Sequence, residues 1–225
     1  MATRENVGHN VKNSTMKNRV ELEKTFWNSF ADKYDGFINN NLSKTYRIIL
    51  DNLANDTKMT KNLLEIATGT GIIALKLSDH ISKIIAIDIA PEMIKIAQEK
   101  CIQKSISNID FRIGDSCSLE FQDKTFDTII ASNVLHLLFE PDLALQEMRR
   151  VLEDNGQIII PTYCHGANLK SHIISRLMGL AGFKARTRWT LATFRDLVKN
   201  NGFRIIKEDV IKDKIPLLYL IGEKE

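Results

Sequence analysis

The segment LLEIATGTGIIAL, residues 63–75, constrains the fold more than any other part of the chain. An apolar run ends at Ala67, two glycines follow at Gly69 and Gly71, and apolar residues then recur at helical spacing. This order predicts a strand, a glycine turn and a helix, the unit in which backbone N–H groups approach a nucleotide. From Gly69 the letters also fit the dinucleotide pattern G-x-G-x-x-G/A. Two glycines alone are equally compatible with a tight turn that binds nothing.

The rest of the chain alternates between short apolar runs rich in β-branched residues and amphipathic segments. The apolar runs after the first are KIIAID, IDFRIG, FDTIIAS, GQIIIPTY, FRIIKEDVI and PLLYLIGE. Strands separated by helices of this length form parallel crossovers, whereas the last two runs are closely spaced. The sequence therefore predicts an α/β fold: a doubly wound, mostly parallel seven-stranded sheet with a C-terminal antiparallel strand pair.

The length and composition predict one domain with two atypical segments. A chain of 225 residues suffices for one full-sized core. Residues 1–20 contain few large apolar side chains, so we expect a loose N-terminal tail. Residues 21–225 form the domain, in which helices over residues 21–55 precede the first strand. A mixed basic and apolar insertion at residues 164–189 has the character of a lid.

Charge and cysteine content exclude several classes of function. The net charge of +3 is too small to indicate a nucleic-acid partner. The three cysteines form neither a C-x-x-C nor a Cys/His pattern, so no disulfide framework or metal site is expected. No apolar leader or membrane-length run occurs in the sequence. We therefore expect a cytoplasmic protein.

Acidic residues stand at three successive strand ends. Glu65 lies in the first strand, Asp88 ends the second, and Asp115 follows the third. A single acid of this kind is more often a helix cap or a solvated loop residue. However, ligands of open α/β sheets bind at the carboxyl edge of the strands, where Asp88 would bind a ribose and Asp115 a base amine. Three acids at that edge favour a nucleotide-like cofactor.

Five motifs, in order and spacing, resemble a known family: EIATGTG, IIAIDIAPEMI, FRIGDSCSLEF, FDTIIASNVLHLL and RRVLEDNGQIII. They are similar to the motifs of class I S-adenosylmethionine-dependent methyltransferases, in particular the small-molecule, quinone-biosynthesis-like branch. The segment FWNSFADKYD resembles the N-terminal helix of that branch. The resemblance implies a Rossmann-like methyltransferase fold, S-adenosyl-L-methionine as cofactor, S-adenosyl-L-homocysteine as product, and a small-molecule methyl acceptor.

The resemblance also implies roles for residues of the glycine turn. Glu65 would orient the turn and the methionine end of the cofactor, and Gly69 and Gly71 would let the backbone pass close to it. Asp88 would bind both ribose hydroxyls. Where Ala67 stands, this branch usually has glycine, so this chain adds one methyl group to the turn.

The remaining positions implied by the resemblance would hold the adenine and the methionine end: Ile89, Met93, Asp115, Ser116, Asn133 and Tyr34. The first two would flank the adenine, and Asp115 with Ser116 would contact its edge. Asn133 would place its backbone near the methionine amino group. Tyr34 would close over the methionine carboxylate.

Methyl transfer from a sulfonium needs an aligned acceptor and no metal, and a histidine can serve as base for a hydroxyl or acidic carbon. His136 follows the fourth strand and His165 follows the fifth, both on the cofactor side of the expected sheet. His136 is the first candidate for a base or an acceptor-orienting group, and His165 is the second. The alternative for His136 is a structural histidine that packs a loop on a helix.

The insertion contains a cluster of basic side chains: Lys170, His172, Arg176, Lys184, Arg186 and Arg188. It could attract an anionic acceptor, meet phospholipid headgroups at a membrane surface, or form a solvated surface helix over the pocket. Two rival functions share the glycine turn, an NAD-dependent oxidoreductase and a non-catalytic S-adenosylmethionine-binding regulatory protein. No motif specifies the acceptor, the atom that is methylated or the oligomeric state.

Overall fold

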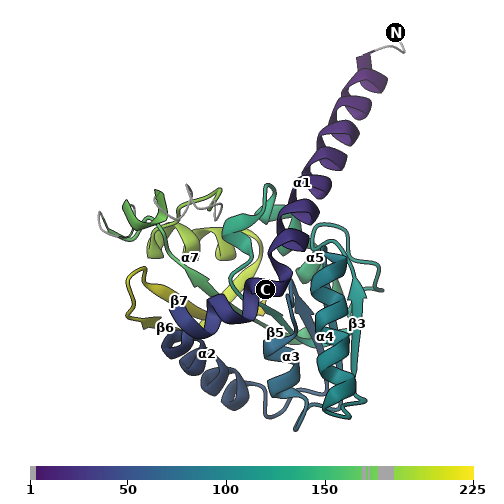
Figure 1. Ribbon diagram of the computed structural model, residues 1–225. Helices are drawn as coiled ribbons and strands as arrows, with labels where there is room; N and C mark the ends of the chain where they lie inside the picture. Colours follow the sequence, from purple (N-terminus) through teal and green to yellow (C-terminus); the bar gives the residue numbers. More distant parts are fainter. Residues whose placement is uncertain (1–3, 169–170, 172, 177–184) are drawn as a thin grey trace.

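The computed structural model describes residues 4–168, 171, 173–176 and 185–225. Its centre is a seven-stranded sheet in the order β3-β2-β1-β4-β5-β7-β6 (Figure 1). The strands are β1 (Asn62–Ile66), β2 (Lys83–Asp88), β3 (Ile109–Ile113), β4 (Phe126–Ala131), β5 (Leu152–Tyr163), β6 (Phe203–Ile211) and β7 (Leu217–Lys224).

The strand directions confirm the predicted fold class. Strands β1 to β5 pair in parallel, while β7 is antiparallel to both β5 and β6. The short connection between β6 and β7 explains the reversal, because a parallel crossover would need a dozen or more residues. Strand β7 inserts between β5 and β6. On the other side of β5, the chain order reverses between β1 and β4. This is the point where open α/β sheets bind ligands.

Helices cover both faces of the sheet. They are α1 (Arg4–Asn41), α2 (Ser43–Asp56), α3 (Ile72–Leu77), α4 (Pro91–Gln103), the 3-10 helix η1 (Leu135–Leu137), α5 (Pro141–Val151) and α7 (Leu191–Asn200). Helices α2, α3 and α4 pack on one face, and α5 and α7 pack on the other. Both faces are therefore apolar, which explains the continuous hydrophobic runs of the inner strands.

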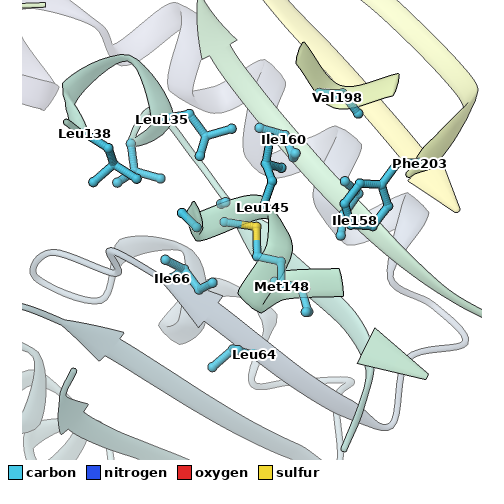
Figure 2. Close-up of a cluster of buried hydrophobic side chains, with 14 of the residues drawn as sticks. Leu64, Ile66, Leu135, Leu138, Leu145, Met148, Ile158, Ile160, Val198 and Phe203 are labelled. Atoms are coloured by element: carbon cyan, nitrogen blue, oxygen red, sulfur yellow. The ribbon is translucent and has the colours of Figure 1, made fainter. Parts of the chain in front are cut away.

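Neighbouring residues of one strand enter different cores. Leu63 of β1 packs with α2 and α3, whereas Leu64 points to the opposite face. Figure 2 shows the second core, in which Leu145 and Met148 of α5 lie over Leu64, Ile66, Ile158 and Ile160. Alternation with a period of two directs successive side chains to opposite faces.

The N-terminal segment differs from the sequence prediction. Residues 1–20 were expected to form a loose tail, but α1 begins at Arg4, and its first part projects away from the sheet (Figure 1). The packed part of α1 supplies the physical reason: Ala31 lies against Ala90 and Met93 at the start of α4. Once a helix is nucleated there, extending it costs little, and residues 4–20 contain no proline.

The insertion at residues 164–189 is described only in part. Residues 173–176 are helical, and Gly166 N–H donates to the carbonyl of Trp189, which closes the insertion at its base. Lys170, His172 and Lys184 of the expected lid lie outside the described residues. Among the helices of the described ranges, none combines the length and the apolar character needed to span a membrane.

The turn between β1 and α3 depends on a glycine. Gly71 has φ +79° and caps α3, and a Cβ at this position would lie 2.8 Å from Phe111 Cζ and 3.1 Å from Ala97 Cβ. A side chain would therefore meet the packed core in a backbone conformation that L-residues rarely adopt.

We expect Gly71→Ala to lower the free energy of unfolding by roughly 2–4 kcal/mol, from backbone strain and overpacking combined. Gly36→Ala is the matched control, since Gly36 is helical with open space around its Cα. That variant should gain about 0.5–1 kcal/mol. Urea denaturation measures both, and equal stability of Gly71→Ala and wild type would contradict the assignment.

Candidate functional site

A cavity of about 400 Å³ lies at the carboxyl edge of the sheet, between the strand ends and α1. It contains nine of the residues predicted from the sequence: Tyr34, Ala67, Gly69, Asp88, Ile89, Met93, Asp115, Ser116 and Asn133. Glu65 and Gly71 are not in its wall, because Glu65 is buried in β1 and Gly71 caps α3. The structure thus brings the ends of neighbouring strands together around one space.

Asp88 links the glycine turn to the end of β2. Its two carboxylate oxygens accept hydrogen bonds from Gly69 N–H at 2.8 Å and Ala90 N–H at 2.9 Å. Burial raises the pKa of Asp88 to about 6, an increase that the N–H donors of Ala90 and Gly69 limit. Near neutral pH the group is therefore mainly an anion that borders the cavity.

Glu65 supports the turn from below. Its carboxyl accepts a hydrogen bond of 2.8 Å from the hydroxyl of Thr68. Only 2% of Glu65 is exposed, and burial raises its pKa to about 8. A cationic group bound above the turn would stabilise the ionised form of this carboxyl.

Two non-glycine residues of the cavity wall have strained backbones. Ala67 and Asn133 both have φ +55°, in the left-handed region. At Ala67 this conformation disfavours alanine and would suit glycine, the residue that the sequence resemblance implies at this position. Asn133 N–H donates to the carbonyl of Pro161 at 2.7 Å, which fixes the loop after β4. Such strain is commonly found at functional sites.

Helix α1 closes the cavity over the glycine turn. The ring of Tyr34 would lie 3.4 Å from a Cβ built on Gly69, an ordinary van der Waals contact, so it is the φ of +56° that favours glycine at this position. One residue further on, Asp35 accepts from the hydroxyl of Thr70 and forms an ion pair with Lys100 of α4. Lys100 Nζ also donates to the carbonyl of Thr70 at 3.0 Å. These contacts connect α1, the turn and α4.

Asp115 and Ser116 form the third part of the wall. Cys117 N–H donates to the carboxylate of Asp115 at 2.9 Å, and a β-bridge joins Asp115 to Ser118. This local turn places Asp115 and Ser116 after β3, in the wall of the same cavity as Ile89 and Met93, which follow β2. The apolar and polar side chains of this part of the wall suit a ligand group that is flat and apolar with polar edges.

A second cavity of about 300 Å³ adjoins the first and contains His136 and His165. The residues that border both cavities are Trp27, Tyr34, Asn133 and Leu137. The ring centroids of the two histidines are 4.9 Å apart. Both predicted histidines thus lie together, in the neighbouring cavity.

Both histidines are neutral near pH 7. Burial, followed by the proximity of His165, lowers the pKa of His136 to about 3. Burial and the charge of Arg188 lower the pKa of His165 to about 4. The carbonyl of His136 accepts from Arg186 N–H at 2.9 Å, so the end of the insertion is attached to η1.

Three wall residues were not selected from the sequence as site residues. Trp27 and Tyr46 fall in the helices expected over residues 21–55, and Arg186 in the basic cluster of the insertion. Tyr46 contacts Tyr34 through their hydroxyl groups at 3.2 Å, across two helices. The aromatic residues of α1 and α2 are visible in the sequence. Their place in the cavity wall is not, because it depends on a contact between two separate helices.

The backbone of the glycine turn does not suit a dinucleotide. A pyrophosphate is bound by free N–H groups at the start of such a helix. Here Thr68 N–H donates to the carbonyl of Ile87, Gly69 N–H donates to Asp88, and Gly71 N–H donates to the carbonyl of Thr68. The buried carboxylate of Asp88, which is mainly ionised near neutral pH, would also repel phosphates. A ligand with hydroxyls and positive charge fits these groups, as S-adenosylmethionine does.

Comparison with known proteins gives the same class. The family described as a methyltransferase domain matches residues 57–200, and the chain belongs to this family. Its cofactor is S-adenosyl-L-methionine, and the acids and glycines of the first cavity fit that molecule. The described residues contain no group of three potential metal ligands.

Two curated relatives are similar over part of their length. Demethylmenaquinone methyltransferase of Paenarthrobacter aurescens (strain TC1) is 33% identical over 159 residues, which cover 66% of this chain and 60% of that protein. Phosphatidylethanolamine N-methyltransferase of Cereibacter sphaeroides is 31% identical over 128 residues, covering 56% of this chain and 62% of that protein. The chain therefore matches less than two thirds of either relative.

Solved structures show the same fold. The PH0226 protein from Pyrococcus horikoshii OT3 has a TM-score of 0.69 and 23% identity, covering 83% of this chain and 93% of its own. A SAM-dependent methyltransferase from Aquifex aeolicus has a TM-score of 0.63 and 19% identity, covering 78% and 89% respectively. The seven-stranded sheet is thus shared with proteins of low sequence identity.

Glu65→Gln tests the electrostatics of the turn in the ligand-free protein. Because the pKa of Glu65 rises from 4.5 to about 8 on folding, its stabilising contribution is present below pH 4.5 and lost as the pH rises to 8. Glutamine cannot ionise and retains an acceptor for Thr68. We expect the variant to be more stable at pH 8, on the order of 1–3 kcal/mol, and similar to wild type at pH 4.5.

Thermal and urea unfolding between pH 4.5 and 8 measure the effect. The control is Glu120→Gln, which changes an exposed glutamate and should leave the pH dependence as in wild type. A Glu65→Gln variant that is less stable than wild type at pH 8 would contradict the raised pKa.

Proposed function

We propose that the chain catalyses methyl transfer from S-adenosylmethionine to a small-molecule acceptor held in the second cavity. The observation that carries this proposal is the arrangement of the two cavities, which meet at Trp27, Tyr34, Asn133 and Leu137. When bound, the cofactor supplies an activated methyl group. The protein then has to align an acceptor for in-line displacement and exclude water.

Residues of the first cavity would bind the cofactor. Asp88 accepts hydrogen bonds from the ribose hydroxyls. Its hydrogen bond from Gly69 N–H fixes the conformation of the glycine turn. Ile89 and Met93 flank the adenine, and Asp115 with Ser116 contacts its edge. These assignments are supported by the lining of one continuous wall.

Three further residues complete the proposed cofactor site. Glu65 orients the turn through Thr68. Asn133 presents its backbone to the methionine end, and Tyr34 covers that end from α1. Together these groups enclose the methionine end of the cofactor and exclude water from it.

His136 and His165 would contact the acceptor. If the acceptor is a hydroxyl, its oxygen becomes far more acidic as it gains the methyl group, so a neutral imidazole of low pKa can take the proton. The names of two relatives suggest demethylmenaquinone-like or phosphatidylethanolamine-like acceptors. The apolar wall supports a compact acceptor, and the scattered cysteines support a cytoplasmic location. A contact of the basic insertion with a membrane surface would use its described basic side chains, such as Arg186.

Calorimetric titration with S-adenosylhomocysteine tests the cofactor assignment. We expect binding by the wild type and a roughly 10- to 100-fold loss of affinity in Asp88→Asn, because hydrogen bonds to a charged group are lost. Asp110→Asn, at an exposed position on β3, is the control and should bind like wild type.

The circular dichroism and melting temperature of Asp88→Asn establish that it is folded, since asparagine can still accept one backbone N–H. Titration with NAD under the same conditions should give no heat of binding. Binding of NAD in place of S-adenosylhomocysteine, or unchanged affinity in Asp88→Asn, would overturn the assignment.

A further inference from the structure

The first cavity reaches the surface between α1 and the end of the insertion. Among the described residues of its wall, only Leu22 of α1 and Arg186 of the insertion are exposed. The groups proposed to hold the cofactor, such as Gly69 and Asp88, are buried. Leu22 and Arg186 therefore mark the mouth of the cavity, past which a cofactor would enter and leave.

On one side of the mouth, Arg186 is attached to the segment after β4. Its guanidinium carbon lies 3.2 Å from the centroid of the Phe139 ring, in the geometry of a cation–π contact. The carbonyl of His136 accepts hydrogen bonds from the N–H groups of Arg186 at 2.9 Å and Thr187 at 3.3 Å. The backbone bonds fix where residue 186 stands, and the ring contact fixes only its side chain.

On the other side of the mouth, α1 contributes Glu23 to the cavity wall. Partial burial lowers the pKa of Arg186, and the negative charge of Glu23 acts in the opposite direction. The guanidinium is thus attracted to α1 while it lies on the ring of Phe139. One side chain therefore links α1 to the segment after β4 across the mouth.

The contacts further along α1 are stronger than those at the mouth. Asp35 forms an ion pair with Lys100 and accepts from the hydroxyl of Thr70. The Lys100 side chain is only 22% exposed, whereas Phe139 is 45% exposed and Arg186 lies at the surface. Hydrogen-bonded charge pairs hold more firmly than an exposed cation–π contact. The mouth is consequently the part of this wall that opens most easily.

We propose that the contact between Arg186 and Phe139 is a gate, which opens each time the cofactor binds or its product leaves. The proposal rests on the proposed function, because it takes the first cavity as the cofactor site. The contacts of Arg186 named above are all with the protein, so they contribute alike to the free and the occupied chain. Such a contact slows exchange without changing affinity. Because S-adenosylhomocysteine leaves by the same mouth, the gate also limits the rate of turnover.

Stopped-flow fluorescence of the full chain with S-adenosylhomocysteine tests the gate, with Trp27 in the cavity wall as the reporter. The dependence of the observed rate on ligand concentration gives the association and dissociation rate constants. In Arg186→Gln and Phe139→Leu we expect both constants to rise roughly 2- to 5-fold, the factor that corresponds to an exposed cation–π contact. The dissociation constant should stay within about 2-fold of the wild-type value, since both rates change together.

A double variant and a matched control separate the gate from a general loosening of the fold. Arg186→Gln combined with Phe139→Leu should exchange the ligand no faster than either single variant, because all three lack the same contact. Arg112→Gln is the control, since it removes a guanidinium 6.0 Å from the Phe121 ring, outside the described walls of both cavities. Its rate constants should equal those of the wild type. Melting temperatures show that each variant is folded, and Arg186→Gln, which changes an exposed side chain, decides the question alone if Phe139→Leu is unstable.

Unchanged rate constants in Arg186→Gln would overturn the gate. So would faster dissociation with a matching loss of affinity, because Arg186 would then contact the cofactor itself, and so would multiplied effects in the double variant. If S-adenosylhomocysteine does not bind to the wild type, the cofactor assignment and the gate fail together. Binding at rates that the variants do not change removes the gate and leaves the cofactor assignment intact.

Discussion

The carboxylate of Asp88 joins three pieces of the chain at the carboxyl edge of the sheet. It stands at the end of β2 and accepts N–H groups from Gly69 in the glycine turn and Ala90 before α4. The N–H group of Gly69 is therefore bonded within the protein and is not offered to a phosphate. One side chain thus determines both the shape of the turn and the kind of cofactor that suits it.

The position of helix α1 depends on its contacts with the glycine turn. Tyr34 lies over Gly69, and Asp35 connects to Thr70 and Lys100. The same helix forms part of both cavities through Trp27 and Tyr34. The cofactor cavity and the histidine-lined cavity therefore share a wall that exists only when α1 is packed against the turn and α4.

Much of this arrangement follows from short-range patterns in the sequence. Short apolar runs rich in β-branched residues, and their spacing, indicate the sheet, and acids at strand ends such as Asp88 indicate its functional edge. The hydroxyl contact between Tyr34 and Tyr46 was not predictable in this way, because it depends on how two helices pack. The same holds for Arg186, whose backbone is attached to His136 across the fold.

The helical state of residues 4–20 also depends on tertiary structure. Their polar composition indicates little burial, yet the helix continues from a segment that is packed at Ala31. The low pKa values of His136 and His165 arise in a similar way, since burial by distant segments lowers them. Local sequence identifies both histidines but gives no indication that they are uncharged.

The central claim is that a methyl group moves from a cofactor in the first cavity to an acceptor in the second. The most direct measurement uses S-adenosylmethionine with a deuterated methyl group, hydroxylated one- and two-ring acceptors, and mass spectrometry of the products. The account predicts a labelled acceptor formed in equal amount with S-adenosylhomocysteine, and loss of both products when His136 and His165 are both replaced by leucine. Tight cofactor binding with no label on any acceptor would contradict it and would instead indicate a non-catalytic binding protein.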